Sequence, residues 1–372
     1  MNTLTIHTLT ALPLHNLNRD ESGAPKQIQE GGVTRARLSS QSIKRSARLE
    51  FERTLAERER SVRSKIQVAD IVATAVQVAN DKGIDVTPAK ERALEKALRK
   101  IILKLTHGKD DAEKEADSDK KDTLVWLSAG ERHLLAQNAV DQVLRAGTDD
   151  IDGDAVDQST DSLAIAAFGR MFAAAPTLTM EAAVAVGNAT TTHEASIELD
   201  YFTAVDDLRA AAGDAGAGQL GYQMYTSGVY YQAITIDRAQ LLRNYTGNLD
   251  SADGRSQLGE LVRQLVVALP QGKKSGTAPF AMPSIVLLEE QSYRTAYQFQ
   301  TPVQPDEDGG YLTTSAQALG EKASKARAFD EEAFGASFVT GTDAELFGAL
   351  DAQRGSLKDA TEFAVEWILA GR

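Results

Sequence analysis

Alternation of polar and apolar residues marks the start of the chain. Residues 3–12 read T-L-T-I-H-T-L-T-A-L, the period of two that is typical of a half-buried strand. Residues 15–33 are rich in Asn, Gly, Pro and charge, which predicts a surface loop. Two serines, 39 and 40, then offer an N-cap for a helix over about 41–55. The buried stripe of that helix is predicted to be Ile43, Ala47 and Phe51.

Helical periodicity, interrupted by charge-dense loops, fills residues 56–161. Thr87 and Pro88 supply a cap and a first-turn proline for one helix, and Ser128 with Glu131 forms a capping box for another. The charged runs at 110–122 and 147–161 are too polar to bury and are predicted to be solvated loops. We interpret this region as a helical insertion.

Strand patterns return at 163–169 and 182–192, and 222–236 is the most strand-like segment of the chain. Asp237 caps a short predicted helix, 257–269 forms another, and 284–289 is the last clear strand. The predicted elements follow one another as strand, helix, insertion, two strands, helix and strand. This is the order of a βαββαβ ferredoxin-like sheet, so the predicted class is α+β. After residue 291 only helices near Leu346 and Phe363 are predicted.

Composition narrows the function classes. The 372 residues are 42% hydrophobic, enough for one large domain or two smaller ones. No apolar run is long enough to span a bilayer, so we expect a cytoplasmic protein with no membrane partner. The chain has no cysteine, which excludes disulfides and cysteine-ligated metals, and its five histidines are scattered. We therefore expect no metal site and no cofactor.

Charge is distributed unevenly along the chain. The formal net charge is -13, yet residues 34–66 hold ten Lys and Arg against four Glu, while 147–161 hold six Asp and no base. Arg35 and Arg37 alternate, so an extended backbone would project both to one side, just before a helix N-terminus that suits phosphate. Lys44, Arg45 and Arg48 follow on one exposed helix flank. The alternative is a capped surface helix with solvated arginines.

Further candidates lie in loops. Lys273 and Lys274 sit in a glycine-bounded run, and Arg170 follows the predicted strand at 163–169; the alternative for the lysine run is an ordinary turn. Tyr201 and Phe202 precede an Ala- and Gly-rich run and could stack on bases from a projecting arm, or belong to an amphipathic segment. No nucleophile elbow, P-loop, His-Glu-x-x-His pattern or RNA-recognition aromatic signature is present, so backbone contacts must carry any RNA affinity.

Three motifs, in order, carry a family resemblance. They are LNRDESGAPKQIQEGGVTRARLSSQSIKRSAR from residue 17, TTTHEASIELDYFTAVDDL from 190 and YTSGVYYQAITIDRAQL from 225. Together they resemble the CasC (Cse4) family, the backbone subunit of the type I-E CRISPR Cascade complex. The resemblance covers about the first fifty residues and most of 163–288.

The resemblance implies a hand-shaped fold: a modified ferredoxin-like (RRM-like) palm at 1–56 and 163–372, a helical fingers insertion at 57–162, and a protruding thumb hairpin at 193–224. It implies polymerisation of several copies along one CRISPR RNA. Phosphate contacts are assigned by resemblance to Lys26, Arg35, Arg37, Ser40, Gln41, Lys44, Arg45 and Arg48.

The thumb is expected to cross the RNA of the neighbouring subunit, with Tyr201, Phe202 and Val205 helping to flip a base and Met171 packing beside the kink. The family often has Trp-Phe where this chain has Tyr-Phe. Implied partners are the CRISPR RNA, the target DNA strand, copies of this chain, the crRNA-processing endonuclease, the large and small subunits, and the 5'-handle-binding subunit.

The leading hypothesis is a noncatalytic RNA-binding scaffold. The alternative is a ferredoxin-like RNA endonuclease that uses Asp20 with His7 or His15. A filament protein that binds no nucleic acid would leave the basic helix unexplained.

Overall fold

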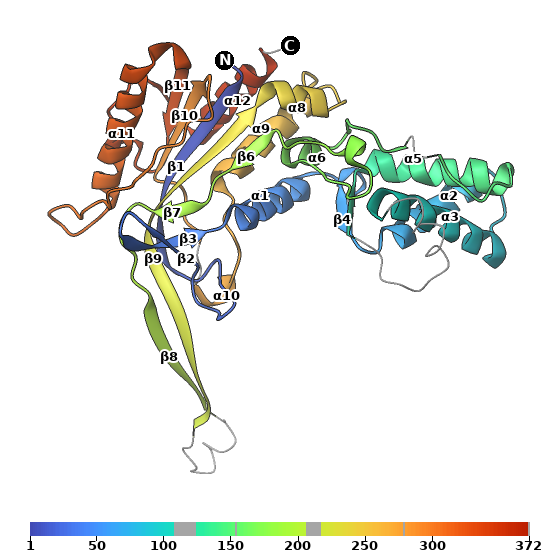
Figure 1. Cartoon of the computed structure of the whole chain (residues 1–372), viewed down its shortest axis with the longest axis horizontal. Helices are drawn as coiled ribbons and strands as arrows, with labels where there is room; N and C mark the ends of the chain where they lie inside the picture. The colour runs from blue at the N-terminus through green and yellow to red at the C-terminus, as the bar shows by residue number, and fades with distance from the viewer. Residues whose placement is uncertain (108–123, 153–154, 206–216, 278–279, 371–372) are drawn as a thin grey trace. The chain divides into compact units, whose positions relative to one another are not determined.

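One mixed sheet organises the first of two compact units, which comprises residues 1–50, 185–236 and 261–368. The computed structural model describes residues 1–107, 124–152, 155–205, 217–277 and 280–370. Within them the strand order is β12-β11-β10-β1-β9-β7-β3-β2, and β6 and β8 also pair with β9 (Figure 1). The strands are β1 Thr3–His15, β2 Gln27–Glu30, β3 Val33–Leu38, β6 Val184–Val186, β7 Ala189–Thr191, β8 Glu198–Val205, β9 Ala217–Asp237, β10 Ile285–Gln291, β11 Phe334–Thr340 and β12 Gln353–Arg354.

Helices cover this sheet. On one face, α11 packs Leu319 and Ala323 against Leu9, Ile285 and Val339, which lie on three neighbouring strands. A second cluster joins Ile43 of α1 to residues of β1, β3, β7 and β9. The helices of this unit are α1 Ser40–Thr54 and α9 Ala252–Val267, each of which continues into the second unit, together with α10 Lys274–Thr277, α11 Leu312–Phe329 and α12 Leu357–Leu369.

The second unit comprises residues 51–184, 237–260 and 369–372, so the predicted insertion at 57–162 lies within it. Its core is built from Leu94, Leu98, Leu127 and Leu135, among others. Its elements are β4 Val62–Ser64, α2 Gln67–Asp81, α3 Pro88–Thr106, β5 Val125–Leu127, α5 Ala129–Ala139 with a π-helical turn at Val140–Arg145, α6 Leu163–Phe168 and α8 Arg238–Asn244. No helix in the described part of the chain is both long and apolar enough to cross a membrane.

Local sequence signals are confirmed. Thr87 accepts a hydrogen bond from the Lys90 N–H, Ser128 and Glu131 form the predicted capping box, and Asp237 caps α8. The predicted strand at 222–236 lies within β9. Each of these features depends on residues that are close together in the sequence.

Other predictions are wrong. The segment at 163–169 is not a strand but the helix α6, because a short, wholly apolar run has no period that separates a buried helix from a buried strand. β1 is not half-buried: residues 3–10 are all buried, so both faces of the strand are covered there. The loop predicted at 15–33 contains β2 and the buried Ala24. The prediction also missed α11 and β11.

Candidate nucleic-acid interface

The corner between β3 and α1 holds most of the predicted RNA contacts. Two asparagine side chains fix its backbone: Asn18 Oδ1 accepts a hydrogen bond from the Ser39 N–H at 2.8 Å, and Asn188 Oδ1 accepts one from the Ser40 N–H at 2.9 Å. Arg37 pairs with β7 immediately before the corner. The first turn of α1 is therefore set by loops distant in sequence, and neither asparagine was a predicted site residue.

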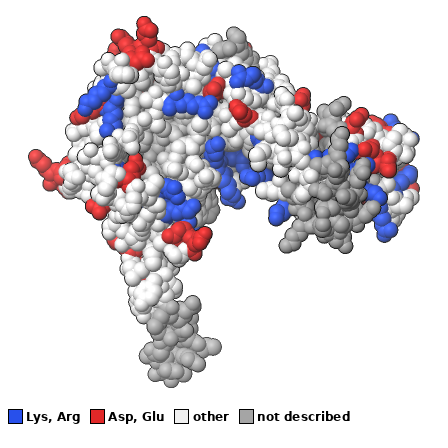
Figure 2. Space-filling view, viewed as in Figure 1, with Lys and Arg blue, Asp and Glu red and all other residues white. Residues whose placement is uncertain are grey.

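One flank of α1 presents basic side chains. Lys44 and Arg48 are half-buried, Arg45 and Gln41 are exposed, and Ile43 is buried as predicted. Among the described residues neither Lys44 nor Arg45 has an ion-pair partner. Burial lowers the pKa of the Lys44 ammonium, because the charged form loses hydration. Figure 2 shows Lys and Arg side chains gathered where α1 lies in Figure 1.

Arg37 and Lys26 extend this basic surface on the sheet side. The Arg37 N–H donates to the Lys26 carbonyl at 2.8 Å, which holds the two backbones together. Arg37 is half-buried, and its Nε has no hydrogen-bond partner within the described chain although water cannot reach it. We call Lys26, Arg37, Ser40, Gln41, Lys44, Arg45 and Arg48 the basic corner. An anion bound here would find several donors already in place.

Arg35, although grouped with Arg37 by its spacing, is not part of the basic corner. Its side chain is fully buried, with 0% exposure. The guanidinium donates to the carbonyls of Thr191 at 2.8 Å and Glu30 at 3.2 Å, and also to the carbonyl of Phe299. The prediction that Arg35 contacts phosphate is therefore wrong, because main-chain acceptors already satisfy its donors.

Arg170 is likewise buried, at 5% exposure. Its Nη1 donates to Glu131 at 2.6 Å and to the Trp126 carbonyl at 3.3 Å. This removes Arg170 from the candidate RNA contacts, because the charge is paired inside the second unit. Its neighbour Met171 is 78% exposed and stays a candidate for contact with bases, while Phe172 on the other side is buried.

Strands β8 and β9 form a hairpin in the region where the thumb was predicted (Figure 1). In its register Tyr201 lies opposite Tyr222, whereas Phe202 lies opposite Gly221. Successive residues of a strand point to opposite faces, so Tyr201 and Phe202 do not share one. Val205 ends β8, but its side chain, like the predicted Ala- and Gly-rich tip at 206–216, lies outside what is described.

The two hairpin faces differ in chemistry. One carries Leu199, Tyr201 and Tyr222, which are 60%, 52% and 65% exposed. The other carries Phe202, and here Lys273 Nζ donates to Gln223 Oε1 at 3.1 Å. The side chain of Lys274 is outside the described set. Leu199 and Tyr222 were not predicted as site residues, although Leu199 alternates with Tyr201 and Tyr222 opens the predicted strand at 222–236.

The residues proposed for catalysis are engaged in structural bonds. Asp20 Oδ1 accepts hydrogen bonds from the Ser22 N–H, the Ser22 hydroxyl and the Ala24 N–H, and these bonds lower the pKa of the carboxyl. His15 is buried against Tyr230. His7 is buried between Tyr231 and Glu289, at 2.9 and 3.1 Å.

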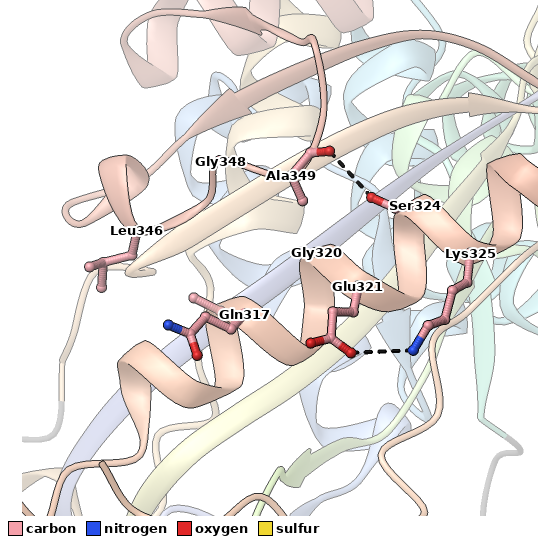
Figure 3. A pocket seen from close by; sticks show the side chains of 9 residues that line it. Gln317, Gly320, Glu321, Ser324, Lys325, Leu346, Gly348 and Ala349 are labelled. Atoms are coloured by element: carbon pink, nitrogen blue, oxygen red, sulfur yellow. Dashed lines mark hydrogen bonds and ion pairs between the residues drawn. The ribbon is translucent and has the colours of Figure 1, made fainter. Parts of the chain in front are cut away.

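A hollow of about 510 Å³ lies beside α11, lined by Gln317, Gly320, Glu321, Ser324, Lys325, Leu346 and Gly348, among others (Figure 3). Glu321 and Lys325 pair at 3.3 Å, and Ser324 Oγ donates to the Ala349 carbonyl. The two charges that line this hollow cancel, so it has no net positive charge that would attract a phosphate.

Comparisons with known proteins agree with the sequence motifs. A family model described as CT1975-like protein matches residues 4–363. A chain of a CRISPR RNA-guided surveillance complex, pre-nicking, superposes with a TM-score of 0.75 and 25% identity, covering 98% of this chain and 100% of that one. A chain of another CRISPR RNA-guided surveillance complex gives 0.68 and 21%, covering 98% and 99%. The curated proteins contain no match. These findings confirm the resemblance inferred from the sequence.

Proposed function

We propose that this chain, which belongs to the CT1975-like protein family, is a noncatalytic CRISPR RNA-binding backbone subunit. Several copies would oligomerise along a guide RNA in a type I-E Cascade complex in the cytoplasm and present the guide for pairing with target DNA. The subunit would contact the crRNA-processing endonuclease, the large and small subunits and the 5'-handle-binding subunit. The surveillance complexes that its structural neighbours come from support membership in such an assembly.

The observation that carries the proposal is the basic corner. Arg37, Lys44 and Arg45 have no ion-pair partner within the described residues, in a chain whose net charge is -13. Holding such cations together costs free energy unless an anion binds among them. A guide RNA varies in sequence, so its carrier should grip phosphates and leave base edges free to pair.

The fold supports the palm assignment. Strands β10, β1, β9 and β7 are neighbours in that order, which is the 4-1-3-2 order of a βαββαβ sheet whose strands follow the chain as β1, β7, β9 and β10. We infer a modified ferredoxin-like palm extended at both edges by further strands. In this interpretation the hairpin of β8 and β9 is the thumb, and the helices within 57–162 are the fingers.

The first experiment asks whether the purified chain copurifies with short RNA of uniform length, as a filament of fixed copy number requires. Binding to mixed-sequence RNA is then measured over a range of salt concentrations. Replacing Arg37, Lys44 or Arg45 by Ala should weaken binding for any sequence and reduce the salt slope by roughly 0.7 per lost contact. Lys325→Ala is the matched control, since this exposed lysine already pairs with Glu321. Equal losses for the control would contradict a grip at the corner.

Absence of catalysis is tested separately. The assembled protein is incubated with guide and complementary RNA, with and without a divalent metal, and both strands should stay intact. The engaged states of Asp20, His7 and His15 support this expectation. If a strand is cleaved and the Asp20→Ala substitution abolishes that cleavage, the endonuclease alternative is favoured.

A further inference from the structure

We propose that His193 forms a proton-sensitive joint between the β8–β9 hairpin and the sheet that carries it. The neutral imidazole fills a gap in the hydrogen bonds of β9, and an added proton opens that gap. The joint is a property of the fold and requires no RNA, so it goes beyond the proposed function.

The joint lies where β9 changes partners. Thr191 of β7 is paired with Tyr230, and the pairing of β9 resumes with β8 at Glu198 and Tyr225. The described residues 192–197, which lie between the two pairings, belong to no strand. Strand β9 is therefore held by the sheet on one side of this segment and by β8 on the other, and the segment connects the two.

A side chain replaces a main-chain acceptor in this segment. In a regular antiparallel ladder, Thr192 and Val229 would exchange two main-chain hydrogen bonds. The Thr192 N–H does donate to the Val229 carbonyl at 2.9 Å, but the Thr192 carbonyl accepts from the Val303 N–H instead. The Val229 N–H donates to His193 Nε2 at 3.1 Å. The imidazole thus satisfies a buried N–H that the ladder leaves without a carbonyl.

The hydrogen bonds of the ring fix its protonation state. His193 Nδ1 lies 2.6 Å from the Glu194 carbonyl, which can only accept, so Nδ1 carries a proton. Nε2 accepts from Val229 and therefore carries none. A second proton would set an N–H of the ring against the N–H of Val229, and this hydrogen bond would be lost.

Close packing prevents the ring from turning away. His193 is 4% exposed and stacks on Tyr311, with ring centres 3.8 Å apart. A Cβ at Gly228 would lie 2.8 Å from two atoms of the ring, so β9 passes directly beside it. Gly228 also has φ of +152°, which side-chain-bearing residues rarely adopt. We infer that a protonated ring is accommodated by separation of the 192–197 segment from β9.

The surroundings disfavour the imidazolium. Arg35 of β3 is the charged group that acts on the ring, Tyr311 is the titratable group in contact with it, and no carboxylate pairs with it among the described residues. Burial, and after it the charge of Arg35, lowers the pKa of His193 below its ordinary 6.5, although the hydrogen bond to the Glu194 carbonyl opposes this shift. The joint therefore takes up a proton when it opens, so it is closed above pH 6.5 and opens more readily as the pH falls.

Amide hydrogen exchange of the full-length chain, without RNA, tests the joint between about pH 7.5 and 5. Protection factors, which correct for the pH dependence of exchange itself, are compared for Val229 at the joint and for Leu287 in β10. The Val229 factor should fall by up to about tenfold for each pH unit below 6.5, because opening is coupled to uptake of one proton. The Leu287 factor reports unfolding of the whole sheet and should fall less.

Two variants separate titration from packing. His193→Gln offers an amide oxygen to the Val229 N–H but has nothing to titrate, so the protection factor of Val229 should no longer depend on pH beyond what Leu287 shows. Gly228→Ala places a methyl group where the ring lies, so Val229 should be poorly protected at every pH. His133→Gln, at an exposed position, is the matched control and should behave as the unmodified chain.

Three results would overturn the proposal. Val229 could lose protection only in step with Leu287, which would mean that acid unfolds the sheet as a whole. His193→Gln could retain the full pH dependence, which would assign it to another group. Gly228→Ala could keep Val229 fully protected at neutral pH, which would show that the ring does not close the joint.

Discussion

Tyr201 and Phe202 are adjacent in sequence but belong to opposite faces of the β8–β9 hairpin. The Tyr201 ring centre lies 5.3 Å from that of Tyr222, whereas Phe202 covers Gly221. A single flipped base therefore cannot contact both residues from one side. The hairpin presents two separate aromatic surfaces, one built from two tyrosines and one that carries the single ring of Phe202.

A double-mutant cycle on RNA affinity tests this division. Tyr201→Ala and Tyr222→Ala should each weaken binding, by roughly 1 to 3 kcal/mol if a base stacks there. Their effects should be less than additive, because residues in contact share one surface. Tyr201→Ala and Phe202→Ala should instead add. Strong coupling of Tyr201 to Phe202, with Tyr222 independent, would restore the single wedge that the sequence predicted.

The sequence predicted what depends on near neighbours. The hairpin strand β9 and the capping box at Ser128 follow from spacings of two and three residues. Arg35 shows the limit of such reasoning. It does alternate with Arg37, but the carbonyl of Phe299, 264 residues away, accepts a hydrogen bond from Arg35 and not from Arg37. Arg170 fails for the same reason, since Glu131 comes from another helix. The sequence shows where a cation lies along the chain, but not whether it is paired or with which partner.

Arg35 should behave as a structural residue. Arg35→Ala would leave the carbonyls of Glu30, Thr191 and Phe299 buried without donors, so we expect the free energy of unfolding to fall by about 3 kcal/mol or more. Urea denaturation measures the loss. Arg35→Lys keeps a charge but not the planar fork, so it should lose much of this stability and yet keep the full salt slope for RNA. A slope reduced by roughly 0.7 in a folded Arg35→Lys variant would reinstate the phosphate contact.

The buried pair of Arg170 and Glu131 predicts a second stability effect. Their atoms lie 2.6 Å apart, with side chains 2% and 7% exposed. Arg170→Met leaves a buried carboxylate without its cation, so the free energy of unfolding should fall by about 3 to 5 kcal/mol. The double variant, which adds Glu131→Gln, should recover part of this loss. Thermal or urea unfolding of the three proteins gives the comparison. A double variant no more stable than Arg170→Met would mean that the carboxylate charge is not the cause.

The buried histidines predict that mild acid weakens the fold. Burial lowers the pKa of His15 from 6.5 to about 4, because the charged imidazolium would lose its hydration. Burial lowers the pKa of His193 as well. A group whose pKa is lower in the folded state takes up a proton on unfolding. Its contribution to stability is therefore complete above pH 6.5 and is lost as the pH falls toward 4.

From His15 alone, the free energy of unfolding should drop by about 2 kcal/mol between pH 7 and pH 5. Urea midpoints measured across this range give the slope. His15→Gln keeps a polar group beside Tyr230 but has nothing to titrate, so its stability should be lower at pH 7 and flatter with pH. His133→Gln, at an exposed position, is the control. If His15→Gln retains the full pH dependence of the unmodified chain, the loss comes from other groups, and His15 binds its proton equally well in the folded and unfolded states.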